Sequence, residues 1–499
     1  MKLNQYIVSL VILAFAATSC QDYLTVMPEN NQSTTQYWKT KEDVEAVLIS
    51  GYIKLRDAQE YLLLWGEARG NGIYMSTSGS TGLIAAQKLR SFDILATNDL
   101  AKWDKLYAII NMANSVIKYG PTVKDASFNE NVMHSYLSEA YFQRALAYFY
   151  LVRLWGNVPF VKEPYINDSS PYTIAQTTGD EILKSCLIDL NNGLESAKSK
   201  FPETDITNPI NTKGRATKWA IYSLIADINL WLGNYDDCIP ACDAVINSGQ
   251  VGLISSSNWF ANFYPGNSNE SIFEIQYSYT LNQTNSILTW FSTNKNYFIS
   301  PYQQFMFESN ATDIRGNKAS YTATDSKIWK YIGYKTTTDP ANSADVRSAS
   351  TQNDQHWIIY RLADIYLMQA EAYTMKGDSA SIAKAVTLLN AIRKRAGLLE
   401  SAGNAEKLGM MKLILEERQR EFFCEGKNWF DLVRIGRRLN PGFKDMFIDQ
   451  VLQVASASTS AMVRAILQDP NSWYLPIHSD ELITNSLLVQ NPYYANLGN

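Results

Sequence analysis

The sequence predicts a mainly α-helical protein whose helices come in repeated pairs, with a loop-rich, partly β insertion between two of the pairs. Three observations support this. Apolar residues recur at helical spacing along most of the 499-residue chain. A pattern of helix, glycine turn and second helix occurs more than once, and one internal segment differs sharply in composition. With 46% hydrophobic and 19% charged residues, the chain has the composition of a folded globule.

The first nineteen residues have the pattern of a secretory signal peptide. Lys2 supplies the positive start, and residues 7–17 form an apolar run that is too short to span a bilayer, which takes about 20 residues. The run ends in ATSC at Cys20, which resembles a bacterial lipobox, although such sites favour Leu where Ala17 stands. We expect removal of residues 1–19, lipidation of Cys20 and a polar tether over residues 20–36. Ordinary secretion without a lipid is the alternative.

Three long amphipathic segments follow the tether. The spacing of apolar residues predicts helices over 37–57, 100–119 and 135–155. The last is aromatic on several sides, which is typical of a buried helix, and Gly156 and Pro159 end it. We expect residues 37–499 to form one domain.

The next helices repeat a theme. Residues 224–235 and 367–378 align without gaps on Gly233 and Gly377, and a second helix is predicted after each, over 239–247 and 382–395. An earlier pair is predicted from 145–156 and 180–197. A helix, a small-residue turn and a second helix, used repeatedly, indicate tetratricopeptide-like packing. A generic bundle of amphipathic helices is the alternative.

An insertion of different character is expected over about 258–355. Residues 258–334 contain 18 aromatic residues among 77, and only ten charged ones. Alternating apolar residues predict a strand over 270–278, and turn-forming residues dominate the rest. Long loops on a rigid scaffold often carry binding sites.

The sequence offers little for catalysis or for a metal. It contains no P-loop, no HExxH and no GxSxG, and its three His are far apart. We therefore expect neither a cofactor nor a metal, and we expect the dispersed Cys186, Cys238, Cys242 and Cys424 to be buried free thiols. The mixed charges of residues 416–421 (EERQRE) predict a salt-bridged helix face. A pair of glycosidase carboxylates is not excluded.

The overall charge and the aromatic residues favour an uncharged ligand. The net charge of −5 argues against a nucleic-acid binder, which needs a basic face. Aromatic rings stack on the C–H faces of sugars, and amide side chains bond to their hydroxyl groups. A low-charge, aromatic insertion therefore suits a polyhydroxylated ligand.

Several stretches together resemble the SusD/RagB family, the nutrient-binding lipoproteins of Bacteroidetes outer membranes. Their order and spacing cover nearly the whole chain. They are CQDYL at 20–24, RALAYFYLVR at 144–153, WGNVP at 155–159, GRATK at 214–218, RLADIYLMQAEA at 361–372, LNAIRKRAG at 389–397, EERQRE at 416–421, WFDLVR at 429–434 and LPI at 475–477.

This resemblance implies a tetratricopeptide-like scaffold with an inserted, ligand-holding face, and a lipid-anchored, surface-exposed position at the outer membrane. It also implies two partners, an oligosaccharide or polysaccharide and a SusC-like TonB-dependent transporter to which the oligosaccharide is delivered, without catalysis. A surface glycoside hydrolase and a peptide-binding or protein-binding repeat lipoprotein are the alternatives.

The candidate ligand contacts lie in two segments. The first is the glycine-rich stretch 65–80, and the second is the insertion. The residues that we expect to contact ligand are Trp65, Arg69, Asn71, Tyr74, Trp290, Tyr297 and Trp329.

Overall fold

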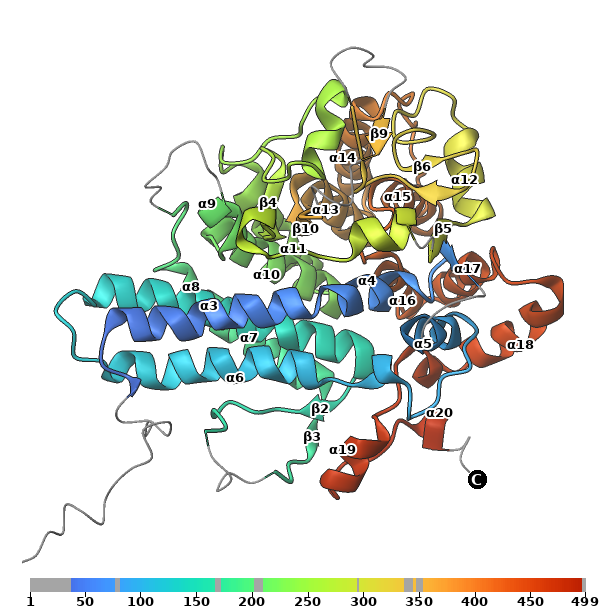
Figure 1. The fold of residues 1–499 in the computed structure, drawn as a ribbon. Coiled ribbons are helices and arrows are strands. Elements are labelled where there is room, and N and C mark those ends of the chain that lie inside the picture. Colours follow the sequence, from blue (N-terminus) through green and yellow to red (C-terminus); the bar gives the residue numbers. More distant parts are fainter. Residues whose placement is uncertain are drawn as a thin grey trace, which may run out of the picture.

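The computed structural model describes residues 37–76, 81–166, 172–201, 210–293, 296–335, 344–346 and 353–495. The predicted signal peptide, Cys20 and the tether lie outside these residues. Figure 1 shows long N-terminal helices along one side of the molecule, with the remaining helix pairs and the insertion above them.

The long helices are α3 (Lys41–Asp57), α6 (Asp104–Tyr119) and α7 (Glu130–Trp155), and α6 packs against both others. Helix α3 begins four residues later than predicted, because Thr40 forms a capping box with Asp43. The Thr40 hydroxyl accepts a hydrogen bond from the Asp43 amide at 3.2 Å, and the Asp43 carboxylate accepts one from the Thr40 amide at 2.8 Å. Helices α4 (Gln59–Glu67) and α5 (Thr81–Arg90) complete this part.

The predicted helix pairs are present. Helix α7 packs on α8 (Gly179–Leu194), and the other two pairs are α10–α11 (Lys218–Leu232, Tyr235–Ile246) and α13–α14 (Leu362–Lys376, Ser379–Arg395). Gly233 and Gly377 end α10 and α13 with φ of 83° and 80°, a left-handed conformation that glycine adopts without a steric penalty. Their alignment in the sequence therefore reflects a shared turn. The predicted mainly α, tetratricopeptide-like scaffold is confirmed.

The C-terminal part is also helical and packs against both the scaffold and the insertion. Its elements are α15 (Lys407–Glu421), α16 (Asn428–Gly436), α17 (Pro441–Leu452), α18 (Ala457–Leu467), α19 (Ser479–Thr484) and α20 (Pro492–Ala495). Short α9 (Ile210–Gly214) precedes α10, and α12 (Pro301–Glu308) lies within the insertion and contacts α15.

The strands are short and concentrate around the insertion. Strand β4 (Ser271–Ile275) confirms the predicted strand and pairs antiparallel with β10 (Trp357–Arg361). A second sheet has the order β1-β5-β7-β6, from Ile73–Met75, Tyr297–Ile299, Lys327–Ile328 and Tyr321–Thr322. Two further pairs are β2–β3 (Val158–Pro159, Gln176–Thr177) and β8–β9 (Gly333–Lys335, Ala344–Val346).

Many aromatic residues of the insertion belong to the hydrophobic core instead of to the surface. Trp259, Phe263 and Tyr331 form edge-to-face contacts there, and the Tyr331 ring stacks on Trp357 of β10 at 5.4 Å. The four predicted free thiols are confirmed as buried free cysteines. The insertion is thus packed as an integral part of the domain.

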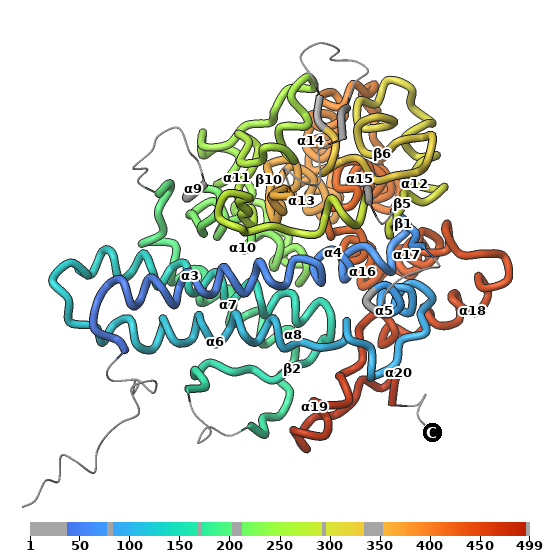
Figure 2. Tube along the Cα trace, viewed as in Figure 1, coloured from blue at the N-terminus to red at the C-terminus, as the bar shows by residue number. Residues whose placement is uncertain are grey.

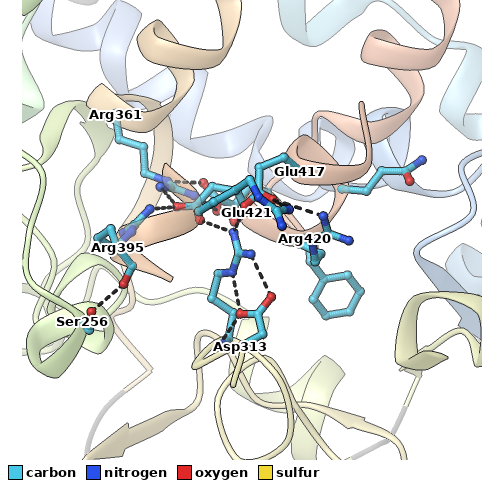
Figure 3. Close-up of polar contacts among 12 residues, drawn as sticks. Ser256, Asp313, Arg361, Arg395, Glu417, Arg420 and Glu421 are labelled. Atoms are coloured by element: carbon cyan, nitrogen blue, oxygen red, sulfur yellow. Dashed lines mark hydrogen bonds and ion pairs between the residues drawn. The ribbon is translucent and has the colours of Figure 1, made fainter. Parts of the chain in front are cut away.

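A buried network of ten charged side chains joins the insertion to the helix pairs (Figure 3). Glu421 at the end of α15 is its centre, with Arg361 at 2.5 Å, Arg315 of the insertion at 2.7 Å and Arg395 of α14 also bonded to it. The acids and bases balance among these ten, which are Glu270, Asp313, Glu417, Glu421 and Glu425 with Arg315, Lys330, Arg361, Arg395 and Arg420. The partly exposed Arg393 adds one further base, 3.4 Å from Glu417.

The salt bridges predicted for residues 416–421 are present. Residues 417–421 are buried, and most of their partners are distant in the sequence. Burial alone would raise the pKa of Glu421, and the guanidinium groups of Arg395, Arg361 and Arg315 hold that pKa well below its ordinary range. The carboxylate is therefore ionised, as the network requires.

A second buried carboxylate, Glu67 at the end of α4, has weaker compensation. One of its oxygens accepts hydrogen bonds from the backbone amides of Gly426 at 2.8 Å and Lys427 at 3.3 Å, and the other has no hydrogen-bond partner in the described part of the chain. Burial raises the pKa of Glu67 to about 8, although these bonds and the charge of Lys330 oppose the increase and Asp431 adds to it. Glu67 is thus largely protonated at neutral pH.

We expect Glu421→Gln to lower the free energy of unfolding by about 3–5 kcal/mol, because it leaves three buried guanidinium groups without their shared partner. Urea denaturation followed by circular dichroism measures this change. Glu416→Gln is the matched control: it lies on the same helix with no ion pair among the described residues, and should change stability by less than about 0.5 kcal/mol. Equal losses in the two variants would contradict the assignment.

The Glu67 carboxyl should make the protein less stable as the pH rises. Its pKa is higher in the folded state than its ordinary value of 4.5, so its stabilising contribution is complete below pH 4.5 and is lost through about pH 8. The expected slope is up to about 1.4 kcal/mol per pH unit in this window. Urea denaturation from pH 5 to 8 should show a flatter dependence for Glu67→Gln than for wild type; parallel curves would refute the role of Glu67.

Candidate functional site

The two segments that were predicted to contact ligand lie side by side in the structure. Strand β1, from the glycine-rich stretch, lies beside β5 of the insertion (Figure 2). The two strands pair antiparallel, with Tyr74 opposite Phe298. The Ser76 amide continues the ladder by donating to the Asn296 carbonyl at 2.9 Å. Segments more than 200 residues apart in the sequence therefore form one surface.

An exposed pair of stacked rings is the main feature of this surface. The rings of Tyr74 and Phe298 lie 5.0 Å apart with planes inclined by only 13°. Side chains alternate along β1, so Ile73 and Met75 point into the core while Tyr74 is 38% exposed. Phe298 is partly exposed and lies opposite Lys327 of β7, whose ammonium group pairs with Asp325 at 2.8 Å. We call this pair of stacked rings the aromatic platform, and the ion pair of Lys327 with Asp325 lies beside it.

The platform is supported from within by other aromatic residues. Tyr297 follows the inward direction of β5 and is 2% exposed, and the rings of Trp290 and Phe291 pack edge-to-face on it at 6.2 and 6.3 Å. Trp290 is 7% exposed and Trp329 is 6% exposed. The structure thus gives Trp290, Tyr297 and Trp329 packing roles, while ligand contact by them stays a prediction.

The glycine-rich stretch is anchored to the core by the side chains of Trp65, Arg69 and Asn71. All three side chains are fully buried. The indole of Trp65 donates to the Leu100 carbonyl at 2.8 Å, the guanidinium of Arg69 donates to the Trp473 carbonyl at 2.7 Å, and the amide of Asn71 donates to the Gln450 carbonyl at 3.1 Å. Arg69 also lies 4.2 Å above the ring of Trp429. Their predicted ligand contacts are untested, and residues 77–80 lie outside the described ones.

Close backbone contact explains the glycines of this stretch. A side chain at Gly66 would place its Cβ 1.9 Å from the Gly426 carbonyl oxygen. Helix α4 can therefore approach the turn at Gly426 this closely only because residue 66 is a glycine. Ser300 then ties the stretch to the insertion, since its amide donates to the Gly72 carbonyl at 2.9 Å and its hydroxyl donates to the Asn71 carbonyl at 2.5 Å. The position of Tyr74 is therefore set from both sides.

Sequence reasoning selected Tyr74 and did not select Phe298. The run Tyr297-Phe298 offered two adjacent aromatic residues, and a period of two along a strand turns only one of them outward. The register with β1 decides that Phe298 faces the platform, and that register is not readable from composition.

Metal and membrane-spanning features were sought in the same described residues. No group of three or more His, Cys, Asp and Glu side chains in them is placed to hold a metal ion. None of their helices combines the length and apolar character needed to cross a bilayer. What the platform can do chemically is stack on a flat, uncharged ligand face.

The chain is similar to known proteins over nearly all its length. It is 24% identical to SusD-like protein P38 of Formosa agariphila, over 98% of this chain and 99% of that protein. A SusD-like protein of Bacteroides ovatus is also 24% identical, over 90% and 85%.

Solved structures show the same fold. A SusD superfamily protein of Bacteroides vulgatus superposes with a TM-score of 0.73 at 20% identity, covering 92% of this chain and all of that one. A protein described as a laminarin-binding SusD-like protein superposes with a TM-score of 0.72 at 20% identity, covering 91% and 100%.

Family models match almost the whole chain in two consecutive parts. Residues 22–230 match the model described as starch-binding associating with outer membrane, and residues 233–494, more than half of the chain, match that of the SusD family. The chain therefore belongs to the SusD family.

Proposed function

We propose that this protein binds a glycan at the outer-membrane surface through the Tyr74–Phe298 platform and performs no catalysis. The observation that carries the proposal is the exposed, nearly parallel ring pair on a ladder held by buried anchors. Sugar rings present flat C–H faces that pack on such rings, and the neighbouring Lys327 is neutralised by Asp325, which suits a neutral oligosaccharide.

The similarity to known proteins supports the same ligand class. One family model is described as starch-binding and one structural neighbour as laminarin-binding, and both of these are neutral glucans. In this proposal the bound oligosaccharide is delivered to a SusC-like TonB-dependent transporter, and Cys20 carries the lipid that keeps the protein at the membrane. The domain limits predicted from the sequence, with residues 37–499 as one unit, are part of the proposal.

Isothermal titration with laminarin, starch oligosaccharides and an anionic polysaccharide tests the ligand class. Binding of a neutral glycan with no release of reducing ends over hours is the expected result. Reducing-end release would instead identify a glycoside hydrolase, and binding of peptides alone would identify a protein-binding lipoprotein.

We expect Tyr74→Ala to weaken binding of the recognised glycan at least about tenfold, equivalent to about 1.4 kcal/mol, because it removes one ring of the platform. The melting temperature should change little, since Tyr74 is 38% exposed. Tyr279→Ala is the control, because Tyr279 is similarly exposed, at 44%, and lies outside the β1–β5 ladder. Unchanged affinity in the Tyr74 variant would exclude the platform.

We expect Cys20→Ala to move the protein from the outer-membrane fraction to a soluble fraction, because it removes the predicted attachment point of the acyl chains. Fractionation of cells and mass spectrometry of the mature N-terminus measure this. Cys186→Ala, which removes a buried thiol, should remain in the membrane fraction. Retention of the Cys20 variant in the membrane would show that another element anchors the protein.

A further inference from the structure

A cavity lies apart from the aromatic platform. It has a volume of about 220 Å³, is partly open to solvent, and is lined by α6, by residues 159–165 and 172–174 between β2 and β3, and by residues 481–488 at and after α19. Figures 1 and 2 show β2 and α19 separated from β5 by the N-terminal helices. The cavity is therefore independent of Tyr74 and Phe298.

Hydrogen bonds between the walls hold the cavity open. On the α6 side, the Tyr107 hydroxyl donates to the Pro159 carbonyl at 2.6 Å, and the Asn111 side chain bonds both backbone groups of Tyr165, at 2.7 and 3.2 Å. On the third side, the Asn485 amide donates to the Ile174 carbonyl at 2.8 Å. These bonds make the cavity a preformed feature of the fold.

Aromatic rings form much of the lining. Trp103 and Tyr107 project from the start of α6, and the rings of Tyr165 and Tyr172 lie parallel within 8° at a centroid distance of 5.9 Å. Because ring faces carry negative electrostatic potential, such a lining attracts organic cations as well as apolar groups.

Two carboxylates, Asp104 and Glu481, also line the cavity, and neither has an ion-pair partner among the described residues. The lysines nearest to Asp104 in the sequence are engaged elsewhere: Lys102 pairs with Asp99 at 2.7 Å, and Lys105 lies over the ring of Tyr61 at 5.0 Å. Asp104 is exposed in the first turn of α6, whereas Glu481 is half-buried, so Glu481 is the carboxylate that carries charge into the cavity.

The environment of Glu481 is consistent with a site that a cation completes. Burial raises the pKa of Glu481, a hydrogen bond from the Trp103 indole lowers it, and the nearby carboxylate of Asp104 raises it further. His478 lowers it and Asp480 raises it by smaller amounts. A bound positive charge would relieve the repulsion between Glu481 and Asp104.

We propose that this cavity binds a small organic ammonium ion, with Asp104 and Glu481 facing the charge and the aromatic rings packing on the carbon skeleton. The volume of about 220 Å³ is below the roughly 300–1,000 Å³ of pockets for drug-sized ligands, so the occupant is no larger than about one sugar ring. An amino sugar with a free amine is one source of this chemistry, and a simple alkylamine is the other.

Titration monitored by NMR, with glucosamine, N-acetylglucosamine, glucose and butylamine as probes, tests the proposal. We expect glucosamine to bind at least about tenfold more tightly than N-acetylglucosamine or glucose, because only it carries the charge. Binding of butylamine as tight as that of glucosamine would show that the amine alone is recognised, whereas weaker binding would show that the sugar ring contributes; both support the site.

Glu481→Gln is expected to reduce glucosamine affinity at least about tenfold while the fold is retained, because the change is isosteric and Glu481 is only half-buried. Asp480→Asn is the matched control, since Asp480 is the neighbouring residue and its side chain is 75% exposed. Tyr74→Ala should leave this binding unchanged, which separates it from the proposed glycan platform. Equal binding of charged and neutral sugars, no binding of any amine, or wild-type affinity in Glu481→Gln would overturn the proposal.

Discussion

The convergence of three guanidinium groups on Glu421 is the constraint on which the rest of the architecture depends. Arg361 ends β10 just before α13, Arg395 ends α14, and Arg315 comes from the insertion, so the carboxylate exists in its buried, ionised form only when all these elements are in place. Desolvating two charges costs about as much as their attraction returns, so such a network contributes little net stability. The network instead favours one arrangement of the elements, because any arrangement that leaves a buried charge unpaired is strongly disfavoured.

The ion-pair network is connected to the aromatic platform through a series of close contacts, and these contacts fix the position of the platform. Lys330 ties the insertion to Glu425 at 2.6 Å, and the turn after Glu425 is the one that receives α4 at Gly66 and Gly426. The stretch that leaves α4 is then fixed by Arg69 and Asn71 before it becomes β1. A short two-strand ladder is marginal by itself, but here each strand emerges from an anchored segment. Tyr74 and Phe298 therefore meet at the surface without having to be ordered by a ligand.

The helical scaffold could be predicted from the sequence more fully than the candidate site, for physical reasons. Helix pairs follow from local periodicity and from the glycines that end them, as at Gly233 and Gly377. The role of Arg69 or Trp290 depends on tertiary partners: a glycine-rich stretch with Trp, Arg and Asn has the same composition whether it contacts a ligand or the core. The ion-pair partners of residues 417–421 could not be predicted for the same reason. The spacing of these charges fits pairing along one helix face, but most of the partners are far along the chain. The meeting of β1 with β5 depends on this long-range packing too.

The buried charges and the rings at the surface have separate roles in the molecule. Every strongly buried base of the network pairs with an acid, so the charges of the network are compensated inside the protein. A pair of rings recognises the shape of a flat sugar face and cannot by itself distinguish one neutral glycan from another. Under the proposed function, discrimination between glycans must then come from polar groups bordering the rings, which can change without disturbing the anchors beneath. The fold would accordingly constrain the position of the proposed ligand more tightly than its identity.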